Sequence, residues 1–173
     1  MAGATPITYL KRKAHLVTQI IGILHKDGIL VASDSQNTQG TSRLMNAEKI
    51  VMLHCNNGDV VIAQAGSFDK SSAAIQYMRE ALEGKSIEYR EHVAKIAEAA
   101  VKKVRMDILN SMQQREYSLD EQNKIFEGPA NKFGLLVAYY YKPERTGLEA
   151  RLLIADEQPY LGTIRLTDRK SVV

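Results

Sequence analysis

The chain has 173 residues, of which 45% are hydrophobic and 25% charged, with a formal net charge of +3 at pH 7. These values are typical of one soluble globular domain, and no apolar run approaches the ~20 residues of a membrane span. The basic residues are scattered among acids, which indicates neither a nucleic-acid nor a membrane partner, and the single cysteine, Cys55, excludes an internal disulfide and favours a reducing, cytoplasmic location.

Residues 1–17 contain the basic run Lys11-Arg12-Lys13 but no sustained hydrophobic period. We interpret them as an N-terminal extension that is removed or left disordered. Residues 18–173 would then form one domain.

Two apolar runs, 18–24 and 29–32, flank Lys26-Asp27-Gly28. Asp-Gly between two such runs predicts a hairpin, in which Gly28 is free to take a positive φ. Neither run alternates cleanly between apolar and polar residues, so we expect both faces of these strands to be covered.

A hydroxyl, a carboxylate and an ammonium accompany this hairpin: Thr18 opens it, Asp34 follows it, and Lys49 precedes the next apolar run. A threonine hydroxyl needs an adjacent base, which can be its own α-amine if the residue is N-terminal. A nearby lysine would lower the pKa of that amine, and an aspartate would hold the lysine in place. The three residues together could therefore activate a nucleophile.

Residues 34–48 read as a polar loop, followed by a second hairpin in which strands 49–53 and 59–63 flank a turn with Gly58. We expect the two hairpins to pair in one sheet. Gly66 would then lie where strand meets helix, a place where backbone N–H groups can receive a developing oxyanion.

Helical spacing predicts a helix that begins near Ser67 or Asp69 and ends at Gly84, and a second over residues 87–112. Residues 113–132 read as a long polar loop. Strands are predicted over 133–141, 148–154 and 160–166.

Several motifs occur together in chain order: Thr-x-apolar-x-Gly, Lys-Asp-Gly, Ala-x-Asp, Thr-x-Gly, Lys-Ile and Ala65-Gly66-Ser67. The combination resembles the β-type subunits of the proteasome and their bacterial relatives, which are N-terminal-nucleophile hydrolases. The resemblance runs from Thr18 to about Ile154. It implies an α+β fold, a four-layer αββα sandwich, and a threonine peptidase that needs no metal or organic cofactor.

Under this resemblance Thr18 matches the nucleophile, Asp34 the aspartate after the second strand and Lys49 the active-site lysine. Gly66 matches the glycine of the oxyanion hole, and Thr38 a residue that pairs with substrate backbone. The positions that would line the pocket for the residue before the cut are Asn37, Gln64, Phe68 and Ser72.

The resemblance also implies assembly into a stacked ring, with an AAA+ ATPase unfoldase or an α-type ring as partner, and a protein or peptide substrate. Two departures from the family pattern oppose activity. Val17 precedes Thr18, where self-cleaved propeptides of the family usually end in glycine, and the chain stops where the family's second helical layer would follow. We expect that layer to be missing and one sheet face to be left apolar and exposed.

Two other functions fit the same residues. The chain could be a structural ring subunit in which Thr18 stays covered by an uncut extension, or a hydrolase of small-molecule amides with the same nucleophile. A thiol dyad of His54 and Cys55 is not expected, because neighbouring residues on a strand point to opposite faces.

Overall fold

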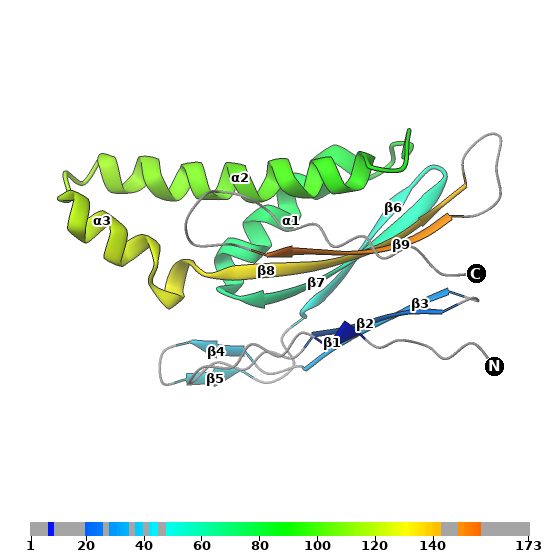
Figure 1. Cartoon of the computed structure of the whole chain (residues 1–173), viewed down its shortest axis with the longest axis horizontal. Helices are drawn as coiled ribbons and strands as arrows, with labels where there is room; N and C mark the ends of the chain where they lie inside the picture. The colour runs from blue at the N-terminus through cyan, green and yellow to red at the C-terminus, as the bar shows by residue number, and fades with distance from the viewer. Residues whose placement is uncertain are drawn as a thin grey trace.

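The computed structural model of the chain describes residues 7–8, 20–25, 28–34, 37–39, 42–44, 48–142 and 149–156. Within this part, helices cover one face of a four-stranded sheet, and a three-stranded sheet lies against its other face (Figure 1). The α+β fold class is confirmed. The described residues supply three of the four expected layers.

The larger sheet is antiparallel, in the order β6 (Ile50–Cys55), β7 (Gly58–Gly66), β8 (Phe133–Tyr141) and β9 (Glu149–Asp156). The turn between β6 and β7 falls at Asn56-Asn57, which confirms the second predicted hairpin. Strand β8 has the predicted bounds, and β9 is displaced by one or two residues from the predicted 148–154. The predicted strand over 160–166 lies outside the described residues.

The smaller sheet contains β1 (Ile7–Thr8), β2 (Ile20–His25) and β3 (Gly28–Ser33). Strands β2 and β3 pair antiparallel with His25 opposite Gly28, whose φ of 154° is positive as predicted. Two residues of the N-terminal extension thus form a strand, because β1 pairs with β2 at Gly22 and Ile21.

The prediction that both hairpins share one sheet is wrong. Strand β7 already has β6 on one side and β8 on the other, so the first hairpin stacks face to face on the larger sheet. Its inner face carries Ile20, Ile29 and Val31, which pack against Ala63, Leu136, Ala138 and Leu152. Stacking buries these side chains, whereas edge pairing would leave them in water.

The outer face of the first hairpin is partly exposed in the described part of the chain, since Ile21 and Ile23 of β2 are half-buried and Leu30 and Ala32 of β3 are exposed, so the prediction that both faces are covered is correct only in part. Residues of β3 alternate between exposed and half-buried, and Leu30 is 58% exposed. This alternation is the pattern of a sheet with one packed and one solvated face. Leu30 is an exposed large apolar side chain on this face of β3.

The predicted polar loop 34–48 contains a two-stranded antiparallel ribbon of β4 (Asn37–Gln39) and β5 (Ser42–Leu44). The loop prediction is wrong at these residues. Their polar side chains gave no apolar run from which a strand could be inferred.

Helix α1 (Phe68–Leu82) follows β7 directly, with Ser67 at its N-cap position and Gly84 just beyond its end. Both predicted boundaries are confirmed, although the Ser67 side chain makes no capping hydrogen bond. Gly84 has φ of +66°, the left-handed conformation that commonly ends a helix.

Helix α2 (His92–Gln113) begins five residues later than the prediction of Ile87. Ile87 is buried as the periodicity required, but the Asn57 side chain holds its backbone in place of a helix. Asn57 Oδ1 accepts from Ile87 N at 2.8 Å, and its Nδ2 donates to Ile87 O at 2.9 Å. The prediction that Ile87 is buried was therefore correct, and the prediction that it lies in the helix was wrong.

Residues 113–132 are not a loop: they include α3 (Leu119–Phe126) and a short 3₁₀ helix over Pro129–Asn131. A capping box begins α3. The Ser118 side chain accepts from Glu121 N, and the Glu121 carboxylate accepts from Ser118 N at 3.0 Å. No residue of α3 is buried, which explains why apolar periodicity did not reveal it.

Replacement of Ser118 by alanine should lower the free energy of unfolding by about 1 kcal/mol, because the first turn of α3 loses its cap. Urea unfolding of the two proteins measures the difference. Ser86→Ala, at an exposed position between α1 and α2, is the control and should change the free energy by less than about 0.5 kcal/mol. Equal effects of the two substitutions would show that the cap contributes nothing.

The larger core lies between the helices and the four-stranded sheet; it includes Leu53, Val60, Ile62, Met78, Leu82, Val93, Val101, Leu135 and Val137, each at most 2% exposed. A smaller core fills the space between the sheets. Gly22 lies at this inner contact, where a Cβ would come within 2.8 Å of the Leu152 Cδ1 atom. Among the described helices, none is both long and apolar enough to cross a membrane.

Candidate functional site

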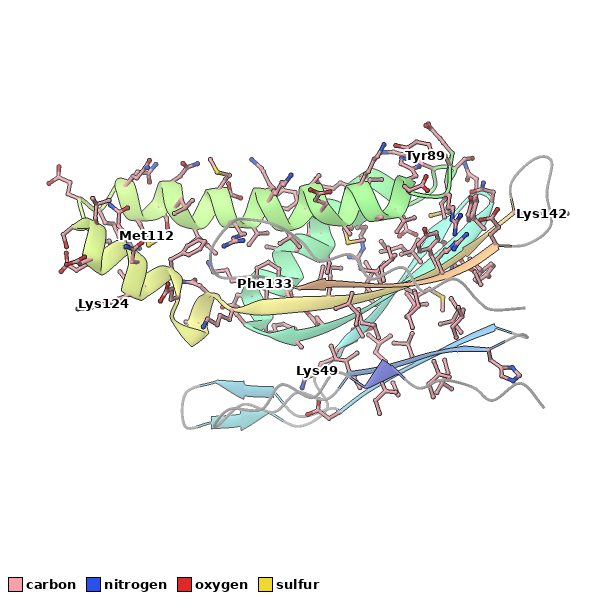
Figure 2. All side chains as sticks on the ribbon, in the orientation of Figure 1. Lys49, Tyr89, Met112, Lys124, Phe133 and Lys142 are labelled. Carbon is pink, nitrogen blue, oxygen red and sulfur yellow. The ribbon has the colours of Figure 1, made fainter. Side chains whose placement is uncertain are left out.

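Lys49 and Asp34 form an ion pair between the two sheets. Lys49 immediately precedes β6 of the larger sheet, and Asp34 immediately follows β3 of the smaller one. The Lys49 Nζ atom donates to Asp34 Oδ1 at 3.1 Å, with the Lys49 side chain 4% exposed and that of Asp34 31% exposed. Figure 2 shows Lys49 at the end of the sandwich where β6 begins. A buried ammonium requires such a partner, so the pair fixes where the positive charge lies.

The segment that carries Lys49 is held by Gln64, its neighbour on β7. Gln64 N donates to Lys49 O at 2.9 Å, and the Gln64 side-chain Nε2 donates to Glu48 O at 3.2 Å. Gln64 is only 3% exposed. The backbone before β6 is therefore held at two consecutive carbonyls by one residue.

Two hydroxyls from the first turns of α1 complete the Gln64 environment. Ser71 Oγ lies 2.6 Å from Gln64 Oε1 and Ser72 Oγ lies 3.3 Å from it. The single Ser71 hydroxyl proton can also reach Ser67 O at 2.8 Å, and the contact with the Gln64 amide oxygen is the shorter of the two. Ser71 was not predicted as a site residue; the only signal in the sequence was a serine on the sheet-facing side of the predicted helix.

Gly66 ends β7 one residue before the N-cap of α1. Its φ of +85° lies in the left-handed region, and a Cβ there would come within 2.3 Å of Lys132 O. The next residue, Ser67, donates its N–H to the same Lys132 carbonyl at 2.7 Å. The position therefore requires glycine on two independent grounds, conformation and space.

The remaining predicted site residues are placed less completely. Thr18 lies outside the described residues, and Asn37 and Thr38 are described only as part of the β4 backbone. Phe68 is 37% exposed at the start of α1, and Ser72 is half-buried against Gln64. Gln64 was predicted to line a substrate pocket, but its side chain is buried and hydrogen-bonded within the protein.

His54 and Cys55 form no dyad, as predicted. His54 Nδ1 lies 2.8 Å from Asp59 Oδ1, whereas Cys55 Sγ donates to Leu82 O at 3.4 Å on the helix side of the sheet. Burial and then the charges of Glu83 and Asp59 raise the pKa of the Cys55 thiol. The thiol is therefore held protonated and is a poor nucleophile.

A family model described as "Proteasome subunit" matches residues 17–120, more than half of the chain. The chain belongs to the proteasome subunit family. The matched range contains Asp34, Lys49 and Gly66 as well as Thr18.

Solved structures of bacterial proteasome-like proteins share the fold of this proteasome-family chain. One is Anbu (ancestral beta-subunit) from Yersinia bercovieri, with a TM-score of 0.52 and 16% identity over 80% of this chain and 52% of that chain. Another is the helical assembly of the Anbu complex from Pseudomonas aeruginosa, with a TM-score of 0.57 and 11% identity over 87% of this chain and 56% of that chain. The proteasome-family chain thus spans about half the length of these proteins. No curated protein is significantly similar to it in sequence.

Proposed function

We propose that the chain is a threonine-type endopeptidase subunit in which Thr18, once N-terminal, attacks the carbonyl of a peptide bond. The observation that carries the proposal is the buried Lys49 ammonium held by Asp34 in a chain of the proteasome subunit family. Burial of the Lys49 charge costs desolvation free energy that an ion pair such as the one with Asp34 often does not repay in full, so the buried pair supports a catalytic use of the charge.

The proposed mechanism assigns one role to each residue. The α-amine of Thr18 accepts the hydroxyl proton, and the Lys49 charge favours the unprotonated amine and the alkoxide. The N–H of Gly66 stabilises the tetrahedral oxyanion, whose collapse breaks the C–N bond as the leaving amine takes the proton held by the Thr18 α-amine. Water then hydrolyses the ester to Thr18, which releases the acyl product and regenerates the hydroxyl. Asn37, Thr38, Phe68 and Ser72 are the proposed substrate-binding positions.

The proposed setting is a cytoplasmic ring that encloses unfolded protein substrates. The P. aeruginosa Anbu relative is described as a helical assembly, which supports oligomerisation of this chain. An ATPase unfoldase or an α-type ring would supply the substrates. Enclosure would protect other proteins from a peptidase that selects little beyond an accessible backbone.

One experiment tests the nucleophile. Intact-mass measurement and N-terminal sequencing, before and after treatment with a threonine-directed electrophile, should show a chain that begins at Thr18 and gains one adduct. Thr18→Ala should lose the adduct, and Thr146→Ala, a threonine that remains in the chain after the extension is removed, should keep it. A chain that retains the extension and gains no adduct would contradict the proposal.

A structural ring subunit is the second candidate, favoured by two observations. Strand β1 of the extension pairs with β2, so the extension is part of the smaller sheet and its removal would break that pairing. The Val17-Thr18 junction also lacks the glycine at which family propeptides are cut. The same mass measurement separates the two candidates.

A further inference from the structure

Gln64 holds the backbone that carries Lys49 and is itself held by helix α1. We propose that Gln64 is a positioning residue, which sets the place of the Lys49 ammonium relative to Gly66 through a hydrogen-bonded path from α1. The role of Lys49 in catalysis rests on the proposed function. The positioning of Lys49 by Gln64 does not depend on catalysis and is measured through the NMR resonance of Lys49.

The hydrogen bonds of Gln64 act on consecutive residues. Its main-chain N–H continues the β6–β7 ladder to Lys49 O, and its side-chain amide donates to Glu48 O. The second bond is made by a side chain and reaches one residue past Lys49, so the pairing of the two strands would not supply it. It therefore restrains the backbone at Glu48, the residue before Lys49.

The orientation of the Gln64 amide is fixed by what surrounds it. Its oxygen faces the hydroxyls of Ser71 and Ser72, which can donate to it, and its nitrogen faces the Glu48 carbonyl, which can only accept. Reversal of the amide would set its oxygen against the Glu48 carbonyl, which can only accept, whereas a serine hydroxyl can donate or accept. With Ser71 1% and Gln64 3% exposed, water does not replace these bonds readily, so the orientation is held.

This path joins the two halves of the candidate site. Gly66 lies two residues beyond Gln64 on β7, and Ser71 lies four residues beyond the N-cap of the helix that begins there. At the other end, Lys49 reaches across to Asp34 on the smaller sheet. Because a displacement of about 1 Å in a reacting group can cost about 100-fold in rate, a buried clamp at this junction has a direct catalytic consequence.

Gln64→Met tests the path, since methionine has a similar length but no donor for Glu48 O. In the full chain, we expect the ¹³Cε resonance of Lys49, assigned with Lys49→Arg, to move from its wild-type position. We also expect the rate of Thr18 modification at saturating electrophile to fall about 10- to 100-fold, with the concentration for half-saturation little changed. Gln76→Met, at an exposed glutamine of α1 whose side chain donates to Glu80, should change neither quantity.

Ser71→Ala is the second variant and decides the matter if Gln64→Met does not fold. It keeps the Gln64 side chain but removes the main donor to its oxygen, so we expect the same changes at a smaller size, a rate about 2- to 10-fold lower. A folded variant in which the Lys49 resonance and the rate both stay at wild-type values would overturn the inference. A moved Lys49 resonance in a chain that never gains an adduct would support the inference and refute the proposed peptidase.

Discussion

Replacement of Lys49 by methionine is expected to lower the rate of Thr18 modification by about 100- to 1000-fold, the range seen when one preorganised electrostatic group is removed from an active site. The buried ammonium, 3.1 Å from Asp34, is the cation that favours the unprotonated α-amine and the alkoxide in the proposed mechanism. The rate is measured from the mass of the adduct against time, at saturating electrophile.

Two further variants show whether the charge and its position both matter. Lys102→Met removes an exposed lysine that pairs with Glu98 on α2, and should leave the rate unchanged. Lys49→Arg keeps the charge, but its planar group does not fit a site shaped for an ammonium, so most of the loss should remain. A Lys49→Met protein that folds and reacts at the wild-type rate would remove Lys49 from the mechanism.

Gly66→Ala should lower the free energy of unfolding by about 3 kcal/mol or more, because two costs add. The φ of +85° is strained for any residue with a Cβ, which costs about 1–3 kcal/mol, and that Cβ would overlap the Lys132 carbonyl oxygen at 2.3 Å. Urea unfolding measures the loss. The rate of Thr18 modification should fall as well. To relieve the overlap, the backbone must turn the Gly66 N–H away from its present direction.

Gly84→Ala is the matched control for Gly66→Ala. Gly84 also has a left-handed φ, +66°, but nothing lies within 4 Å of the position of its Cβ. Only the conformational cost of about 1–2 kcal/mol should remain, with no effect on the reaction of Thr18. Equal losses of stability in the two variants would mean that the end of β7 relaxes around the added methyl group and that the contact with Lys132 is unimportant.

The elements that turn chemistry or strict periodicity specifies were predictable from the sequence. Asp27-Gly28 and Asn57-Gly58 predicted two hairpins, and the uninterrupted apolar run predicted β8 within its observed bounds. The contact between Lys49 and Asp34 agrees with the expectation that an aspartate would hold the lysine ammonium in place.

The partners of Gln64 could not be predicted, because they depend on which layer of the fold packs against each face of the sheet. Alternation along β7 sets Gln64 on the same face as Val60 and Ile62, but it does not say that this face receives α1. The serines of α1 therefore had no assigned partner, and Gln64 was placed in a substrate pocket. Helix α3 escaped prediction because a short exposed helix, stabilised by its capping box, leaves no apolar period to detect.

The Lys49–Asp34 pair connects two parts of the chain. One part is stabilised by the larger core and the other by the smaller core. Lys49, Gln64 and Gly66 belong to the sheet beneath the helices, whereas Asp34 belongs to a hairpin held by the smaller core between the sheets. Native proteins open first where the fewest apolar side chains are buried, so amides of β2 and β3 should exchange with solvent sooner than those of β7 and β8. Helical circular dichroism reports on the larger core, and a preparation can therefore retain its full helical signal after the half of the site that carries Asp34 has opened.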